Sequence, residues 1–296
     1  MVDQAYSLRE MMRNKKAAEA QPSTLMVAVA SGKGGVGKSL FTLNLAISLQ
    51  NRGQRVLVID ADFGLSNLDI MLGITPKFNL AHVLKHECTI EDAVTHCQNG
   101  IMVISGGSGL EELTNLDELA MNTLMRAFLR IQDSADIILF DMGAGVSDRV
   151  VQVISACQKV IIVTTPEPTA ILDAYALLKT LNTEERLPEI RLVVNRADSL
   201  QEGRNMLEKF TQVSQKYLGV EVKPLGIIPY DASAREAIKN QSPLVELHPK
   251  GPASLAIGKI ADDFLGQRSP ENREQSGIAL FFSRLLQRKP TQEHGG

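Results

Sequence analysis

Short apolar runs rich in β-branched residues recur along the chain, and stretches with helical periodicity separate most of them. A continuous apolar run is typical of a strand that is buried on both faces, and parallel neighbours need a crossover connection between them. The alternation therefore predicts an α/β fold, a three-layer sandwich whose mostly parallel central sheet is covered by helices on both faces. Strands are expected at 25–30, 55–60, 101–105, 136–141, 160–164, 191–195 and 225–228.

Two segments fall outside this alternation and suggest how the chain is divided. Residues 1–22 form a tail rich in Met and charged residues, and residues 266–276 read as a flexible polar linker. We therefore expect one domain at 23–265 and a separate C-terminal helix at 277–296.

Composition and charge exclude several classes of protein. Aromatic residues make up 4% of the 296 residues and Trp is absent, which argues against a binder of single-stranded nucleic acid. The net charge of −3 argues against a nonspecific binder of duplex DNA, and no sequence-specific nucleic acid is expected as a partner. The three cysteines form no Cys-x-x-Cys pair, which fits a reducing cytosol. The chain shows neither a signal peptide nor a membrane-spanning run, so we expect a cytoplasmic protein.

The stretch SGKGGVGKS follows the first predicted strand directly and precedes a helical pattern. Its residues 32–39 fit the phosphate-loop pattern GxxxxGK[ST], in which backbone N–H groups and a helix N-terminus surround phosphates. Lys38 is expected against the β- and γ-phosphates, and the Ser39 hydroxyl is expected to bind Mg²⁺. The loop residues expected to bind ATP are Gly32, Lys33, Gly34, Gly35, Val36, Gly37, Lys38, Ser39 and Leu40.

Three carboxylates lie at the ends of two other predicted strands. Asp141 ends the strand in ADIILFDMGAG, while Asp60 and Asp62 end the strand in RVLVIDADFG. Open α/β sheets bind ligands at the carboxyl ends of their strands, and carboxylate oxygens suit Mg²⁺. Asp141 is thus expected to be a Mg²⁺ partner, although any one of these acids could simply begin a loop.

The motifs KGGVGKS, DADFGLSNLD and VVNR resemble those of the deviant-Walker-A ATPases of the MinD and ParA group over roughly residues 25–265. In that family the first lysine of the loop, here Lys33, contacts the partner's phosphates in an ATP-dependent homodimer. A cation supplied by the partner can neutralise transition-state charge as an arginine finger does. The alternative is a solvated loop lysine.

The resemblance also implies ATP or ADP with Mg²⁺ as cofactors, with Lys33, Lys38 and Asp62 in catalysis. Asp62 would orient the attacking water and Asp60 would lie near the metal. The sequence departs from the family at Leu40, where threonine is frequent, and at DMGAG, which replaces DxPAG. Asn195 would read the adenine with Arg196 beside it, Pro229, Tyr230 and Asp231 would close over the base, and Arg149 and Glu167 are candidates for contacts across the dimer.

A group of histidines and cysteines in residues 82–97 raises the question of a metal site. His82 and His86 stand four residues apart, but the spacing of His82, His86, Cys88, His96 and Cys97 matches no familiar metal pattern. Solvated helix residues are the more ordinary interpretation. The lack of Cys-x-x-Cys also argues against the iron–sulfur branches of the same superfamily.

The C-terminal segment GIALFFSRLLQRKP has an apolar and a basic side. A helix of this kind suits an anionic membrane surface, and two helices in one dimer would bind more strongly than one, so ATP could control a reversible, peripheral attachment to the inner face of the cell membrane. A last helix packed on the domain would show the same apolar pattern. The apolar side holds Ile278, Phe281, Phe282, Leu285 and Leu286, and the basic side holds Arg284, Arg288 and Lys289.

The N-terminal tail contains DQAxxLR, which is similar to the flagellar-number regulators of the FlhG type, also called YlxH or FleN. In that family the segment activates the GTPase FlhF, and components of the flagellar switch complex (C-ring) are further partners. The matching positions are Asp3, Gln4, Ala5, Leu8 and Arg9.

The interpretation is therefore a membrane-cycling ATPase that dimerises with ATP, regulates the number or placement of flagella and stimulates FlhF. A septum-site-determining MinD, a ParA-like partition ATPase on DNA and an adaptor with a regulatory nucleotide site stay open as alternatives, and the N-terminal tail could be disordered.

Overall fold

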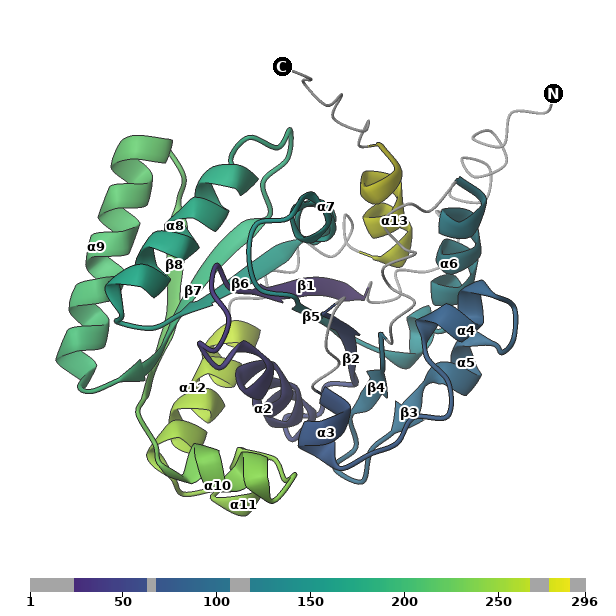
Figure 1. Cartoon of the computed structure of the whole chain (residues 1–296), viewed down its shortest axis with the longest axis horizontal. Coiled ribbons are helices and arrows are strands. Elements are labelled where there is room, and N and C mark those ends of the chain that lie inside the picture. Colours follow the sequence, from purple (N-terminus) through teal and green to yellow (C-terminus); the bar gives the residue numbers. More distant parts are fainter. Residues whose placement is uncertain (1–23, 63–67, 107–117, 267–276, 288–296) are drawn as a thin grey trace.

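The computed structural model describes residues 24–62, 68–106, 118–266 and 277–287. An eight-stranded sheet in the order β3-β4-β2-β5-β1-β6-β7-β8 lies between helices on both faces, which confirms the predicted α/β sandwich (Figure 1). Neighbouring strands are parallel except for the antiparallel pair β3 and β4. The strands are β1 (Leu25–Ala30), β2 (Val56–Ala61), β3 (Thr95–His96), β4 (Met102–Ile104), β5 (Ile137–Met142), β6 (Lys159–Thr164), β7 (Glu189–Ala197) and β8 (Val222–Pro229).

The helices form two layers, each with its own apolar core against the sheet. A short 3-10 turn, Gln132–Ser134, precedes β5. The first layer contains α4 (Leu80–Leu84), α5 (Ile90–Ala93), α6 (Glu118–Arg130), α7 (Asp148–Ala156), α8 (Pro168–Leu181), α9 (Leu200–Leu218) and α13 (Ile278–Gln287). The second contains α2 (Lys38–Gln50), α3 (Leu68–Leu72), α10 (Ser233–Lys239), α11 (Leu244–Leu247) and α12 (Pro252–Gly266).

Strand periodicity determines on which face each carboxylate lies. Successive side chains of a strand point to opposite faces, and in β5 Phe140 belongs to the first core whereas Leu139 belongs to the second. Asp141 therefore lies on the face covered by α2. Asp60 has the same parity in β2 and is the direct cross-strand partner of Asp141. The fold thus brings these two acids together beside the N-terminus of α2.

The structure differs from the predicted elements mainly at the sheet edges. The strand β3 was not predicted, because two partly exposed residues at an edge give no apolar run. The strands β7 and β8 each extend beyond their predicted ranges at both ends. The predicted linker starts at Gly266, which the structure shows as the last residue of α12.

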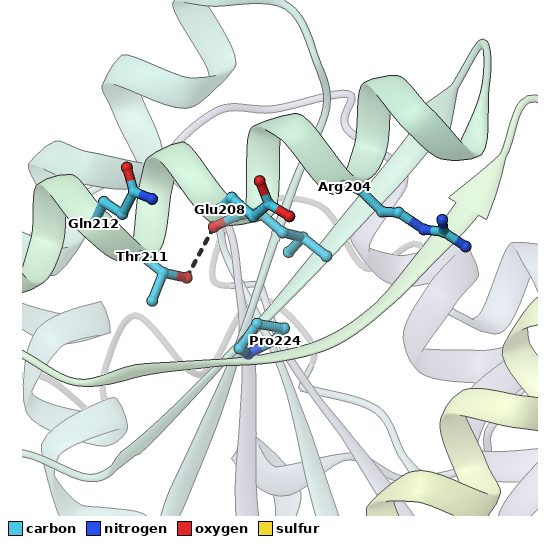
Figure 2. A pocket seen from close by; sticks show the side chains of 6 residues that line it. Arg204, Glu208, Thr211, Gln212 and Pro224 are labelled. Carbon is cyan, nitrogen blue, oxygen red and sulfur yellow. Dashed lines mark hydrogen bonds between the residues drawn. The ribbon is translucent and has the colours of Figure 1, made fainter.

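A hollow on the surface lies between α9 and the edge strand β8 (Figure 2). It is lined by Arg204, Leu207, Glu208, Thr211, Gln212 and Pro224, and the Thr211 hydroxyl donates to the Leu207 carbonyl at 2.8 Å. Its lining contains none of the predicted site residues. The candidate chemistry lies instead where β1, β2 and β5 end.

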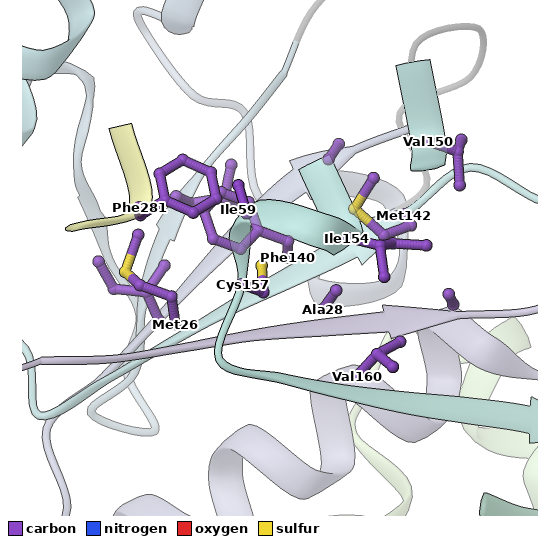
Figure 3. Close-up of a cluster of buried hydrophobic side chains, with 14 of the residues drawn as sticks. Met26, Ala28, Ile59, Phe140, Met142, Val150, Ile154, Cys157, Val160 and Phe281 are labelled. Atoms are coloured by element: carbon purple, nitrogen blue, oxygen red, sulfur yellow. The ribbon is translucent and has the colours of Figure 1, made fainter. Parts of the chain in front are cut away.

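The terminal helix α13 packs on the domain, with its predicted apolar face turned inward. Ile278, Phe281 and Phe282 are at most 3% exposed and belong to the first core. The ring of Phe281 stacks on Phe140 of β5 at 5.1 Å, and Figure 3 shows it among the core side chains. Phe282 contacts Phe128 of α6 at 5.5 Å. The helical periodicity was predicted correctly, and the packed arrangement left open by the sequence is the one present here.

The basic side of α13 is also tied to the domain. The Arg284 guanidinium donates to the Cys157 carbonyl at 3.3 Å, and the Gln152 amide of α7 donates to the Leu285 carbonyl at 3.4 Å. The side chain of Leu286 and the predicted basic residues Arg288 and Lys289 lie outside the described part of the chain. In this arrangement the domain covers the apolar face of α13 and holds its basic side through Arg284.

Candidate functional site

The predicted phosphate loop connects β1 to α2, as its sequence context implies. Two of its glycines are required by geometry. A Cβ on Gly32 would lie 2.1 Å from the backbone carbonyl of Asp173 in α8, and Gly37 has φ +88, a conformation that favours glycine. The Gly145 N–H donates to the Ser31 carbonyl at 2.9 Å, which joins the start of the loop to the segment after β5. The loop is thus held from two sides.

Lys38 is the buried cation of the site. Its ammonium lies 2.8 Å from Asp141 Oδ1 and 3.2 Å from Ser39 Oγ, with Lys38 7% and Asp141 1% exposed. Thr42, one turn along α2, donates its hydroxyl to the same carboxylate oxygen at 2.8 Å. Two charges this deeply buried need each other or an equally charged replacement. A phosphate chain at the loop is such a replacement for Lys38.

Asp60 and Asp62 occupy the next strand end. Asp60 is 1% exposed and accepts from the backbone N–H groups of Asp62 at 3.1 Å and Leu68 at 3.4 Å. A Cβ on Gly143 would lie 3.3 Å from Asp62 Oδ1, so the glycine that replaces proline in DMGAG lies directly beside Asp62. The three predicted acids therefore meet at one edge of the sheet.

The donors at this edge fit a magnesium ion. Asp60 and Asp141 are cross-strand partners on one face, both almost fully buried, and the Ser39 hydroxyl shares the Lys38 ammonium with Asp141. Oxygen donors of this kind are those that Mg²⁺ takes alongside phosphate oxygens. These three residues are the ones suited to hold the ion.

Lys33 contacts its own chain here. Its ammonium lies 2.9 Å from Thr169 Oγ1 and 3.3 Å from Glu167 Oε2, both at the N-terminus of α8. Both charged side chains are well exposed, 40% for Lys33 and 65% for Glu167, so the pair is weak and exchangeable. The other candidate for contacts across a dimer, Arg149, lies in α7, but its side chain is outside the described residues.

The residues predicted to contact the adenine base differ in how exposed they are. Asn195 is buried, and its side chain donates to the Val36 carbonyl at 2.8 Å, while Arg196 beside it is exposed with φ +56. Tyr230 is half exposed at the end of β8, next to Pro229. Asn195 and Arg196 lie beside the loop at Gly37, and a role of all four residues at adenine stays a prediction.

Asp231 has a structural role that the sequence did not reveal. Its carboxylate accepts from the Ser233 N–H at 3.0 Å and the Ala253 N–H at 3.3 Å. Burial opposes ionisation, but the hydrogen bonds from Ser233 and Ala253 outweigh it and lower the pKa of Asp231. The residue therefore links β8 to α10 and α12, and closure over a base is a further prediction.

His82, one of the histidines and cysteines grouped in residues 82–97, has a structural role. His82 forms a capping box with Asn79 at the start of α4, and burial raises the pKa of the Cys97 thiol to about 11. Within 24–62, 68–106, 118–266 and 277–287, no group of three or more His, Cys, Asp or Glu side chains could hold a metal ion. The predicted N-terminal positions Asp3, Gln4, Ala5, Leu8 and Arg9 lie outside the described residues.

Sequence reasoning missed two polar contacts of the site. Thr42 stands three residues after Ser39, so helical spacing alone would have directed its hydroxyl toward the same strand ends. Thr169 gives no such signal, because its contact with Lys33 depends on how α8 meets the loop. Among the described helices, none combines the length and apolarity needed to cross a membrane.

Comparisons with known proteins agree with this geometry. The family model described as ParA, NUBPL iron-transfer P-loop NTPase, matches residues 23–265. The antiactivator FleN of Pseudomonas aeruginosa is 38% identical over 266 residues, covering 90% of this chain and 95% of FleN. The flagellum site-determining protein YlxH of Helicobacter pylori is 33% identical over 89% of this chain and 90% of YlxH.

Solved structures of MinD proteins have a fold similar to that of this chain. The cell division ATPase MinD of Pyrococcus furiosus superimposes with a TM-score of 0.67 at 26% identity, covering 82% of this chain and 99% of MinD. MinD of Pyrococcus horikoshii complexed with Mg-ADP gives a TM-score of 0.67 at 25% identity, covering 82% and 98%. The shared fold therefore extends over nearly the full length of these proteins.

Proposed function

The chain belongs to the ParA family of P-loop NTPases, and from this premise we propose that it is a Mg²⁺-dependent ATPase that dimerises with ATP and controls the number or placement of flagella. The observation that carries the ATPase part is the buried contact of Lys38 with Asp141 beside Ser39. The flagellar part is supported by likeness to FleN and YlxH.

The chemistry follows from an exchange of partners at Lys38. The β- and γ-phosphates offer this lysine several anionic oxygens, which frees Asp141 and leaves Ser39, Asp60 and Asp141 to hold Mg²⁺. The bound ion neutralises charge on the phosphates. Asp62 orients the attacking water at the neighbouring strand end. The charged groups proposed for hydrolysis thus lie side by side at the ends of β2 and β5.

A homodimer around ATP would use the exposed surface beside the loop. Val146 and Leu172 are 43% and 67% exposed, and they flank the segments that contact Ser31 and Gly32. Lys33 lies on the same surface with a weak partner, Glu167. In the dimer Lys33 leaves this contact for the partner's phosphates, where the gain from a charge-assisted hydrogen bond exceeds the small loss.

Membrane attachment requires a conformational change in α13. Three buried apolar side chains hold it on the domain, and the same side chains would enter the membrane. Binding is therefore a competition between two apolar environments, and a dimer with two helices shifts it toward an anionic membrane. This makes attachment reversible and dependent on ATP.

The regulatory part of the proposal concerns partners. The N-terminal DQAxxLR segment stimulates FlhF, with Gln4 acting in the GTPase, and flagellar switch-complex proteins bind another surface. Deleting the gene should change the number or placement of flagella and leave septum position unaltered. Minicells with normal flagella would favour septum placement, and salt-dependent retention on DNA would favour partition.

The ATPase is tested by two substitutions. Lys38→Ala should lose productive nucleotide binding, because no other buried cation faces the phosphates among the described loop residues. Asp62→Ala should keep ATP binding and lose hydrolysis. The measurements are Kd for Mg-ATP and turnover of the full chain with and without anionic vesicles. Normal turnover by Asp62→Ala would refute the role of that residue.

A further inference from the structure

The end of β7 is joined to the phosphate loop by the side chain of Asn195. The inference drawn from this contact rests on the proposed ATP site. Asn195 is 8% exposed, and its amide Nδ2 donates to the Val36 carbonyl at 2.8 Å across 159 positions of sequence. The side chain of Val36 is itself buried in the second core. The carbonyl that accepts this bond is therefore part of a fixed segment of the loop.

The orientation of the Asn195 amide is fixed by the backbone that follows it. Oδ1 accepts from the Arg196 N–H at 3.0 Å, and Arg196 adopts φ +56, which is uncommon for a residue with a side chain. The parallel register of β7 and β8 also shifts between Val194 and Ala197. Asn195 thus lies at an irregular part of the strand, and its amide bonds to the loop through Nδ2 and to the following backbone through Oδ1.

The loop passes Asn195 in direct contact at the residue before the phosphate lysine. A Cβ on Gly37 would lie 2.5 Å from Asn195 Nδ2, and Gly37 has φ +88. Gly37 is also the residue that precedes α2, whose first residue is Lys38. Any shift of Val36 and Gly37 therefore moves both the backbone N–H groups and the lysine that meet the phosphates.

We propose that Asn195 is a positioning residue that holds the phosphate loop in its binding shape, independently of any contact with the base. The hydrogen bond from Asn195 to the Val36 carbonyl fixes the loop relative to the end of β7. A residue that only reads adenine would affect nucleotides with that base alone. A residue that shapes the loop affects every ligand with a phosphate chain, including one without a base.

The test compares Mg-ATP with Mg-tripolyphosphate on the full chain, using displacement of a fluorescent nucleotide analogue. Asn195→Ala should weaken both ligands by about 5- to 10-fold, because it removes one buried hydrogen bond and leaves the Val36 carbonyl without its donor. Asn195→Leu keeps a similar side-chain size and removes the donor without adding charge, so it should weaken both ligands at least as much.

A matched control is Asn182→Ala. Asn182 also donates its amide to a backbone carbonyl, that of Leu218 at 3.2 Å, but it is exposed and far from the loop. Its substitution should leave both affinities unchanged. Thermal unfolding without ligand identifies the variants that remain folded, and Asn195→Leu serves if Asn195→Ala does not fold.

Unchanged affinity for tripolyphosphate in folded Asn195 variants would overturn the inference, even if ATP binding falls. A fall of about 5-fold or more for tripolyphosphate supports it, whatever additional loss ATP shows. Failure of the unmodified chain to bind either ligand would instead refute the ATP site itself, and the inference with it. The unmodified protein thus separates the two failures.

Discussion

The contact between Phe282 and Phe128 gives a prediction about membrane attachment, because it can be weakened without altering α13. Phe128 belongs to α6, is 4% exposed and lies 5.5 Å from the Phe282 ring. Truncating a buried Phe to Ala costs about 3–5 kcal/mol. Phe128 also packs against other side chains of its own helical layer. We therefore assign roughly 2 kcal/mol of the truncation cost to weaker docking of α13. The undocked fraction should then rise about 30-fold.

Phe128→Ala should therefore bind anionic vesicles without ATP, since its membrane-facing side chains are unchanged. Vesicle sedimentation measures this binding, and hydrogen exchange at α13 amides measures undocking. Phe128→Leu should give a smaller increase, and removal of 277–296 from the Phe128→Ala chain should abolish the binding. If α13 of the folded variant exchanges faster but vesicle binding still requires ATP as before, docking does not control attachment.

Two further substitutions test the framework of the domain. Glu189 accepts from Lys159 at 3.1 Å and pairs with Arg191, so Glu189→Gln should lower the free energy of unfolding by about 3 kcal/mol, because it removes the negative charge that faces the buried Lys159 ammonium. An unchanged denaturant midpoint would contradict this. Burial opposes ionisation of Glu189, but the charges of Lys159 and Arg191 outweigh burial and lower the pKa of Glu189. The contribution of the Glu189 carboxylate to stability is therefore complete above its unfolded-state pKa, and it is lost as pH falls through the lower folded-state pKa. As pH is lowered into the acid range, the free energy of unfolding measured with denaturant should therefore fall less for Glu189→Gln than for the unmodified chain. Gly32→Ala should destabilise the domain by about 3 kcal/mol because its Cβ meets the α8 backbone, whereas Gly34→Ala, with nothing within 4 Å, is the matched control in thermal unfolding; equal melting temperatures would refute the close approach.

Much of the fold could be predicted because the central strands are buried on both faces. Their apolar runs identify β1, β2, β5 and β6 to within a residue or two. The same regularity predicted that Asp60, Asp62 and Asp141 meet at the strand ends. The edges were harder, since β3 is only two residues long and gains its partner from the fold.

The sequence could not predict the environment of a side chain when several environments are compatible with its chemistry. The face of α13 with Phe281 and Phe282 fits a membrane and a protein core equally well, and only the contacts with Phe140 and Phe128 in the folded domain decide between them. The amide of Asn195 was predicted to read adenine, and the structure adds a hydrogen bond from it to the Val36 carbonyl, 159 positions away in the sequence. Local pattern carries no information about either choice.

The central claim is that ATP joins two copies of this chain, and it is tested by the mass of the Asp62→Ala protein in analytical ultracentrifugation. With Mg-ATP this variant should be a stable dimer, because it holds nucleotide without hydrolysis, and with Mg-ADP it should be a monomer. Adding Lys33→Ala should weaken the dimer by removing the cation that each copy supplies to the other. A monomer at saturating Mg-ATP would contradict the account.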